Sequence, residues 1–204
     1  MHNKFPKYYY FIDKFNKDDI KKLDKNIAVI YRNYSKKINI KELIVFNKFL
    51  KKKKIKFFLA NNVKLSIKLN LDGVYIPAFN KKISINCFSR KKNFKVIGSA
   101  HNLHDIKIKE KQGIKVLFIS PLFKTFKSLN YLDTIKFNLL TSQTDLKLVA
   151  LGGINQFNFK KLFLLNIYGF ASISFFKKTD KMQLRRIIIK HKNCINNHSK
   201  IVNE

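Results

Sequence analysis

Eight short apolar segments recur along this chain, and longer stretches with helical spacing separate most of them. Each segment has the length of a strand and is almost continuously hydrophobic, as a strand buried on both faces should be. The predicted strands span residues 8–13, 27–31, 55–60, 73–77, 94–100, 114–120, 147–152 and 170–176. This alternation of strands and helices predicts parallel βα units.

The number of strands favours a closed barrel, because eight parallel βα units are what closes a (β/α)8 fold. An open doubly wound sheet is the alternative, and it would bring a glycine-rich turn directly after the first strand. The first strand leads instead into DKFNKDD, which contains no glycine. We therefore predict a single α/β domain, a (β/α)8 TIM barrel over residues 1–192, with a polar C-terminal tail at 193–204.

The stretches between the strands differ in how clearly they read as helices. Residues 40–50 carry a broad apolar stripe, and Asn39 before them is a residue type that favours an N-cap. Residues 155–166 repeat this helical spacing. The stretch 79–92 is the least helical connection, and we expect a loop there.

The formal charge of +31 over 204 residues normally suggests nucleic acid or an anionic membrane as a partner. The lysines, however, are spread from end to end together with abundant Asn, Ile and Phe, which are the residues that AT-rich codons encode. Since no compact recognition motif accompanies the charge, compositional drift is the preferred explanation and nucleic-acid binding a remote alternative. A small phosphorylated substrate would also be attracted by this field.

Other classes of protein are disfavoured by what the sequence contains. The two cysteines, Cys87 and Cys194, give neither a disulfide framework nor a metal-ligand spacing. The first residues lack the apolar core of a signal peptide. No apolar run approaches the ~20 residues that span a bilayer. We expect a cytoplasmic protein without a membrane partner.

Functional residues of such a barrel lie at the C-terminal ends of the strands and on the loops that follow them. This rule selects a set of polar, glycine and proline residues from the sequence. The candidates are Asp13, Arg32, Asn33, Asn61, Asn62, Tyr75, Pro77, Ser99, His101, Ser120, Thr125, Lys127, Gly152, Gly153, Ser172 and Ser174.

The last two loops form the strongest candidate for a phosphate site. The chain has only six glycines, and two of them, Gly152 and Gly153, follow the seventh strand. Barrel phosphate sites commonly lie between loops seven and eight, where backbone N–H groups meet the anion, and Ser174 could add a hydroxyl donor. The alternative is a tight turn at the glycines and a helix cap at Ser174; the retention of two glycines favours phosphate binding.

Arg32 and His101 are the other candidates for chemistry. The planar fork of Arg32 suits a phosphate or diphosphate, although the side chain could instead pair with Asp13. His101 could shuttle protons near neutral pH, and a structural histidine is an equal alternative. His104 lies three residues on, but no third ligand accompanies the pair, so a metal site there is not expected.

Five motifs, in order, resemble one known family. They are DGVYIP (residues 72–77), GSAH (98–101), ISPLFKT (119–125), ALGGIN (150–155) and GFASIS (169–174). In this order and spacing they resemble the thiamine phosphate synthase/TenI family, over most of residues 8–176. The resemblance implies a (β/α)8 barrel of thiamine biosynthesis, a transferase that joins hydroxymethylpyrimidine diphosphate to thiazole phosphate and releases diphosphate with Mg²⁺.

The resemblance also implies roles for particular residues. The thiazole phosphate would be held by Gly152, Gly153, Ser174 and the Phe175 N–H, with Thr125 and Lys127 in the phosphate-binding stretch of loop six. Arg32 and Ser99 would contact the diphosphate.

The family's two metal-binding acids fall here at Asn61 and Asn80, so the sequence departs from the family pattern at the metal site. Two alternatives therefore stay open beside the synthase. One is a TenI-like thiazole phosphate isomerase (tautomerase) with His101 as its base, and the other is a non-catalytic phosphate-binding barrel.

Overall fold

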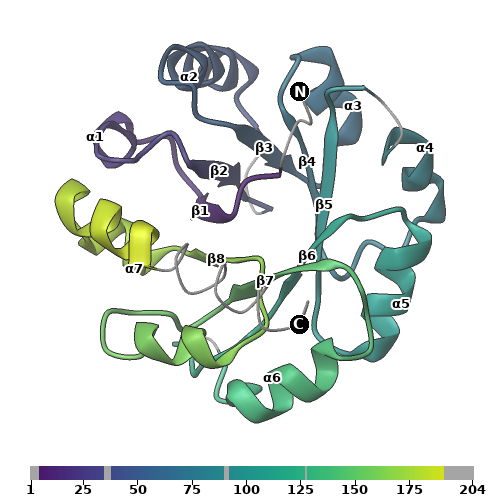
Figure 1. Cartoon of the computed structure of the whole chain (residues 1–204). Helices are drawn as coiled ribbons and strands as arrows, with labels where there is room; N and C mark the ends of the chain where they lie inside the picture. Colours follow the sequence, from purple (N-terminus) through teal and green to yellow (C-terminus); the bar gives the residue numbers. More distant parts are fainter. Residues whose placement is uncertain (1–4, 35–37, 90–91, 127, 191–204) are drawn as a thin grey trace.

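The computed structural model describes residues 5–34, 38–89, 92–126 and 128–190. Eight parallel strands close into a barrel in which each strand pairs with the next along the chain (Figure 1). The strands are β1 (Tyr8–Ile12), β2 (Ile27–Tyr31), β3 (Phe57–Ala60), β4 (Gly73–Ile76), β5 (Lys95–Ala100), β6 (Val116–Ile119), β7 (Lys147–Leu151) and β8 (Gly169–Ser172). The predicted (β/α)8 barrel is confirmed.

The first and last strands complete the ring. β1 pairs with β2 in the register Tyr8↔Ile27 and with β8 in the register Tyr8↔Phe170. A closed sheet has no exposed edge that could pair with another chain. Because all the strands run parallel, their carboxyl ends lie at one rim of the barrel, together with the loops that follow them.

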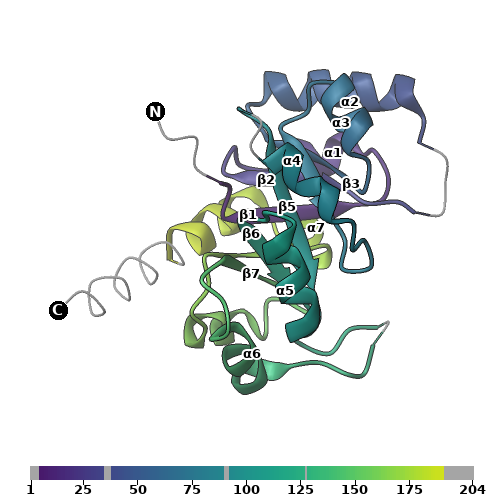
Figure 2. The ribbon, with the colours of Figure 1, turned by 90° about the vertical axis from the view of Figure 1, so that its right-hand side faces the viewer.

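Helices surround the barrel on its outside (Figures 1 and 2). The helical elements are α1 (Lys17–Lys21), α2 (Ile40–Lys52), α3 (Val63–Lys68), η1 (Ile83–Ile85), α4 (Asn86–Ser89), α5 (Leu103–Lys111), α6 (Asp133–Thr141), η2 (Phe159–Leu164) and α7 (Ser174–Lys178). Residues 181–190 are also helical. None of the helices in the described ranges is long and apolar enough to cross a membrane.

Asparagine side chains cap the N-termini of two of these helices. Asn39 caps α2, as predicted, by accepting from the backbone N–H groups of Lys41 and Glu42. Asn102 caps α5 in the same way by accepting from Asp105 N at 2.9 Å. Each cap satisfies N–H groups that have no partner inside the helix.

Two connections and the end of one strand differ from the prediction. Residues 155–166 hold only the short 3-10 helix η2; before it, the side chains of Asn155 and Asn158 accept from each other's backbone N–H groups at 3.1 and 2.9 Å, the reciprocal arrangement of a capping box. The stretch 79–92 contains η1 and α4. The strand predicted at 170–176 ends at Ser172, whose Oγ accepts from Phe175 N and helps to open α7.

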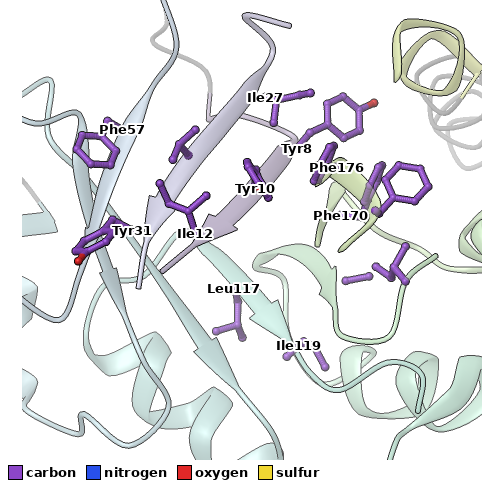
Figure 3. Close-up of a cluster of buried hydrophobic side chains, with 14 of the residues drawn as sticks. Tyr8, Tyr10, Ile12, Ile27, Tyr31, Phe57, Leu117, Ile119, Phe170 and Phe176 are labelled. Carbon is purple, nitrogen blue, oxygen red and sulfur yellow. The ribbon is translucent and has the colours of Figure 1, made fainter. Parts of the chain in front are cut away.

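The core has two layers because adjacent strand residues point to opposite faces of the sheet. Tyr8, Tyr10 and Ile12 of β1 face the surrounding helices, in the cluster of Figure 3. Tyr9 and Phe11 alternate with them and point into the barrel. The interior cluster consists of Tyr9, Phe11, Ala28, Ile30, Phe58, Ala60, Tyr75, Ile97, Val116, Phe118, Val149, Leu151 and Ala171.

Aromatic rings fill much of this interior. The Phe11 and Tyr75 ring centroids are 5.2 Å apart, those of Tyr75 and Phe118 are 5.5 Å apart, and those of Tyr9 and Phe118 are 4.8 Å apart, all edge to face. Edge-to-face packing is the favoured arrangement of aromatic pairs. The lumen is therefore a packed core, and Phe11 and Tyr75 form the floor of the space above it.

Candidate active site

A cavity of about 520 Å³ opens above this floor, at the carboxyl ends of the strands. Its walls come from β4 and from the segments that follow β2, β4, β5 and β6. The lining residues are Arg32, Tyr34, Tyr75, Pro77, Ala78, Phe79, Lys81, Ser99, His101, Asp105 and Ser120. The structure thus brings together the three residues predicted to act in catalysis, Arg32, Ser99 and His101.

Arg32 extends over the aromatic floor from the end of β2. Its backbone N–H donates to the carbonyl oxygen of Ile12 at 2.8 Å, and its guanidinium carbon lies 4.7 Å from the centroid of the Phe11 ring. A cation over an aromatic face is attracted by the ring quadrupole. Among the ion pairs of the described residues, none joins Arg32 to Asp13. The guanidinium is positioned over the floor by stacking.

Tyr75 and Ser99 form the polar part of the floor beside Arg32. Burial raises the pKa of the Tyr75 hydroxyl, while hydrogen bonding to Ser99 and to Arg32 acts in the opposite direction. Tyr75 is 2% exposed and Ser99 is 4% exposed. The Tyr75 hydroxyl carries its proton at neutral pH, as tyrosines ordinarily do, and can donate a hydrogen bond.

His101 lies on the β5 side of the cavity. Its Nδ1 atom lies 2.6 Å from the carbonyl oxygen of Ser120. Its backbone N–H donates to Asp105 Oδ2 at 3.1 Å, so the first turn of α5 fixes the residue. A carbonyl oxygen can only accept, which assigns the ring proton to Nδ1 and leaves Nε2 as the basic nitrogen.

Two lysines add positive charge on the β4 side. Lys81 lines the cavity, whereas Lys109 of α5 is fully buried beneath the loop that follows β4. The Lys109 ammonium donates to the carbonyl oxygens of Pro77 at 2.9 Å and Asn80 at 2.7 Å, and to Gln112 Oε1 at 2.9 Å. Burial lowers its pKa to about 8, so it is mainly protonated at pH 7.

An aromatic pair stands at the rim of the cavity. The rings of Tyr34 and Phe79 meet edge to face with their centroids 5.4 Å apart. Tyr34 is 51% exposed and Phe79 63% exposed. Exposed aromatic faces beside a polar cavity are suited to contact a flat heterocycle.

The predicted phosphate-binding glycines adopt conformations that other residues rarely take. Gly152 has φ +98° and Gly153 has φ +69°. A Cβ on Gly153 would lie 2.5 Å from the carbonyl oxygens of both Phe123 and Lys124. The glycines therefore let the loop after β6 pack directly on the loop after β7.

The remaining predicted phosphate ligands lie close by in the same two loops and in α7. Ser174 is exposed at the start of α7, and the Phe175 N–H donates to Ser172 Oγ at 3.3 Å. Thr125 closes the tip of the loop after β6, where its Oγ1 accepts from Ser128 N at 3.0 Å. Lys127 lies outside the described residues, as does the tail predicted at 193–204.

A second cavity connects this region to the first. It is lined by Phe11, Ile12, Asp13, Arg32, Asn33, Tyr34 and Ile173. It shares Arg32 and Tyr34 with the first cavity and reaches Ile173, the residue before Ser174. A ligand with two ends could therefore extend from the Ser99–His101 side, past Arg32, to the start of α7.

The residues at the family's metal positions do not fit a divalent cation. Asn80 Nδ2 donates to Asn61 Oδ1 at 2.7 Å, and Asn80 Oδ1 accepts from Lys82 N at 3.1 Å. Mg²⁺ in proteins is usually held by one or two carboxylates. No group of three or more His, Cys, Asp or Glu side chains in the described ranges could hold a metal ion.

Some lining residues were missed by the strand-end rule. Asp105, Lys81, Tyr34 and Phe79 all lie a few residues beyond the strand ends, at places where the rule selects no residue. For Asp105 a signal was present in the sequence, since Asn102 and Asp105 have the spacing of a capping box before a helix. For Lys81 the many other lysines hide any signal.

The closed barrel and the cavity at its mouth define a (β/α)8 protein with a polar, basic site at the strand ends. A model of the family described as thiamine monophosphate synthase matches residues 24–176. The chain belongs to the thiamine monophosphate synthase family. This confirms the predicted family.

Individual relatives agree with this membership. A thiamine-phosphate synthase from Pelagibacter ubique is 34% identical over 162 residues, which cover 74% of each chain. A thiamine-phosphate synthase from Methanococcus vannielii is 28% identical over 121 residues, and the match spans only 58% of that relative's length and 58% of this chain. A thiamine phosphate pyrophosphorylase structure from Pyrococcus furiosus has the same fold, with a TM-score of 0.72 and 19% identity over 91% of this chain and 96% of its own.

Proposed function

We propose that this chain is a transferase that joins hydroxymethylpyrimidine diphosphate to thiazole phosphate and releases diphosphate. The convergence of Arg32, Ser99 and Lys81 on one cavity above an aromatic floor is the observation that carries the proposal. These groups offer positive charge and hydrogen-bond donors where a diphosphate leaving group would lie. The names of the relatives support the same reaction.

In this reaction the C–O bond between the pyrimidine methylene and the diphosphate breaks, and the diphosphate leaves with the electron pair. The thiazole ring nitrogen then attacks the methylene carbon, and a C–N bond forms. No proton has to move in either step, so the protein's task is to position both substrates and to stabilise the leaving charge. The guanidinium of Arg32 and the hydroxyls of Tyr75 and Ser99 are suited to that task.

The phosphate of the second substrate would lie at the start of α7, near Gly152, Gly153 and Ser174. The cavity that runs from Arg32 to Ile173 supports this arrangement. A phosphate held at this place would direct the thiazole ring toward Arg32 and toward the methylene carbon of the pyrimidine substrate. Tyr34 and Phe79 at the rim would cover the pyrimidine ring.

One observation favours a second candidate, TenI-like tautomerisation of the thiazole phosphate. That reaction moves a proton between two positions of the substrate, and His101 offers a basic Nε2 whose tautomer is fixed by Ser120. It needs no diphosphate, so Arg32 would have no direct task in it. The two candidates are separable because they depend on different side chains.

The deciding experiment incubates the purified protein with hydroxymethylpyrimidine diphosphate and thiazole phosphate and measures thiamine phosphate and released diphosphate together. We expect both products in equal amounts. Arg32→Ala should lower kcat/KM by ~100-fold, as expected when a group that stabilises developing charge is removed. Lys82→Met is the matched control, because Lys82 is a neighbouring cation that does not line the cavity.

If Arg32→Ala makes thiamine phosphate as fast as the unchanged protein does, the role of Arg32 in stabilising the diphosphate is contradicted. Absence of thiamine phosphate, with tautomerisation of the thiazole phosphate detected by NMR, would replace the first candidate by the second. Absence of both reactions, with thiazole phosphate still bound, would identify a phosphate-binding barrel without catalysis.

A further inference from the structure

We propose that the mouth of this barrel binds diphosphate without a divalent metal ion, with Lys81 and Arg32 supplying the positive charge. This inference rests on the proposed function for the identity of the ligand. It concerns how the leaving group is held, and it follows from the chemistry of the groups around Asn61 and Asn80.

The two asparagine side chains are already occupied by the protein itself. The Oδ1 atom of Asn61 accepts from Asn80, and the Oδ1 atom of Asn80 accepts from the backbone N–H of Lys82. Both amide oxygens, the only side-chain atoms here that could ligate a cation, are therefore engaged. Neither carries the negative charge that normally compensates the dehydration of Mg²⁺.

A buried cation lies directly beneath this pair. The Lys109 ammonium is 2.7 Å from the backbone carbonyl oxygen of Asn80 and is fully buried. A charge removed from water acts over a longer range than an exposed one, because screening is weak in the interior. Lys109 therefore repels a divalent cation at Asn80 and attracts an anion to the same place.

The one acidic residue among those lining the cavity does not supply a metal ligand either. The Oδ2 atom of Asp105 accepts from the His101 backbone N–H, and the Asp105 charge is also attracted to the Lys109 ammonium, an attraction that only partly offsets the lowering of the Lys109 pKa by burial. Its charge is therefore compensated on the α5 side. Arg32 and Lys81, on the opposite loops, are left to face an anionic ligand.

Arg32 and Lys81 suit the two ends of a diphosphate in different ways. The guanidinium of Arg32, held over Phe11, can bind two phosphate oxygens through parallel N–H donors. Lys81 is a flexible point charge next to the Asn61–Asn80 pair, where the family would place its metal. A lysine at that place can neutralise part of the leaving charge without a metal.

The test measures binding of inorganic pyrophosphate by calorimetry, first in excess EDTA and then in excess MgCl₂. We expect binding in EDTA, and no gain in affinity from Mg²⁺, because the metal will compete for the pyrophosphate in solution. Lys81→Met should weaken binding in EDTA by at least about tenfold, which corresponds to about 1.4 kcal/mol. Lys82→Met, the matched control, should bind as the unchanged protein does.

A gain-of-metal variant makes the test reciprocal. In Asn61→Asp/Asn80→Asp the pair carries carboxylates, and pyrophosphate affinity should fall in EDTA and recover with Mg²⁺. Pyrophosphate binding by the unchanged protein that requires Mg²⁺, or no binding under either condition, would overturn the inference. Thiamine phosphate synthesis in the same samples separates the two proposals, since synthesis that stops in EDTA contradicts only the metal-free site.

Discussion

The ring of His101 is hydrogen-bonded to the backbone just after β6, with its Nδ1 atom 2.6 Å from the carbonyl oxygen of Ser120. This contact joins the ends of β5 and β6 and fixes which ring nitrogen carries the proton. The free base, Nε2, therefore belongs to a side chain that cannot rotate without losing a hydrogen bond. Such a group is suited either to proton transfer or to orienting a substrate.

Replacement of His101 distinguishes these two tasks. In His101→Gln, the rate of thiazole phosphate tautomerisation, which depends on proton transfer, should fall by ~10²–10⁴-fold, the usual contribution of a positioned acid–base group. Thiamine phosphate synthesis, which requires no proton transfer, should fall much less. Comparing the two rates for one protein sample checks this, and an equal loss in both would assign His101 to substrate binding.

Gly153 should tolerate no side chain. Gly153→Ala would place a Cβ 2.5 Å from two carbonyl oxygens at a φ of +69°, so we expect a loss of more than ~2 kcal/mol in the free energy of unfolding, measured with urea. Strain at positive φ alone contributes about 1 kcal/mol. The control is Gly113→Ala at φ +72°, which tests that strain by itself; equal losses would mean that the packing of the two loops contributes nothing.

Lys109 should contribute to stability through the loop after β4. Lys109→Met removes one of two donors from each of the carbonyl oxygens of Pro77 and Asn80, which keep Asn80 N and Gln112 Nε2, but it leaves the buried Gln112 Oε1 without its lysine donor. We expect a loss of ~2 kcal/mol, since an unsatisfied buried acceptor costs about 1–3 kcal/mol. Thermal and urea unfolding measure it. Lys107→Met on the same helix removes an exposed ion pair with Glu110 and an exposed hydrogen bond to the carbonyl oxygen of Gln143, and it should cost less than ~1 kcal/mol.

Alkaline pH should unfold the protein together with ionisation of its buried tyrosines. Burial raises the pKa of Tyr8, Tyr9 and Tyr10 above the value of about 10 that an unfolded chain has. Their contribution to stability is thus complete below pH ~10 and is lost as the pH rises toward the folded-state values. The part of the tyrosinate absorbance that comes from these buried residues should appear in the same step as the loss of circular dichroism.

Tyr9→Phe is the matched variant for this prediction. The Tyr9 hydroxyl is buried without a hydrogen-bond partner in the described part of the chain, so its removal should leave stability at neutral pH unchanged or higher. The alkaline loss should become smaller. Tyrosinate that forms well before the fold is lost would show that these hydroxyls are not protected.

The strands could be predicted because burial on both faces makes each one a continuous apolar run, as Ile27–Tyr31 illustrates. Once the strands were known, the rule that functional residues lie at the C-terminal ends of the strands predicted Arg32, Ser99 and His101 at one rim. The helix predicted at 155–166 is present only in part, as the 3-10 helix Phe159–Leu164, because hydrophobic spacing does not report how short a helix will be or of which type. Lys109 was missed because its burial depends on how α5 packs against a distant loop.

The way in which Lys109 holds the loop after β4 has a consequence for how this sequence can diverge. Its ammonium contacts main-chain oxygens of Pro77 and Asn80, atoms that every amino acid supplies. The backbone path of the loop therefore does not depend on which side chain stands at residue 80. An acid can become an amide there, and the chemistry of the mouth can change, while the backbone that carries it keeps its course.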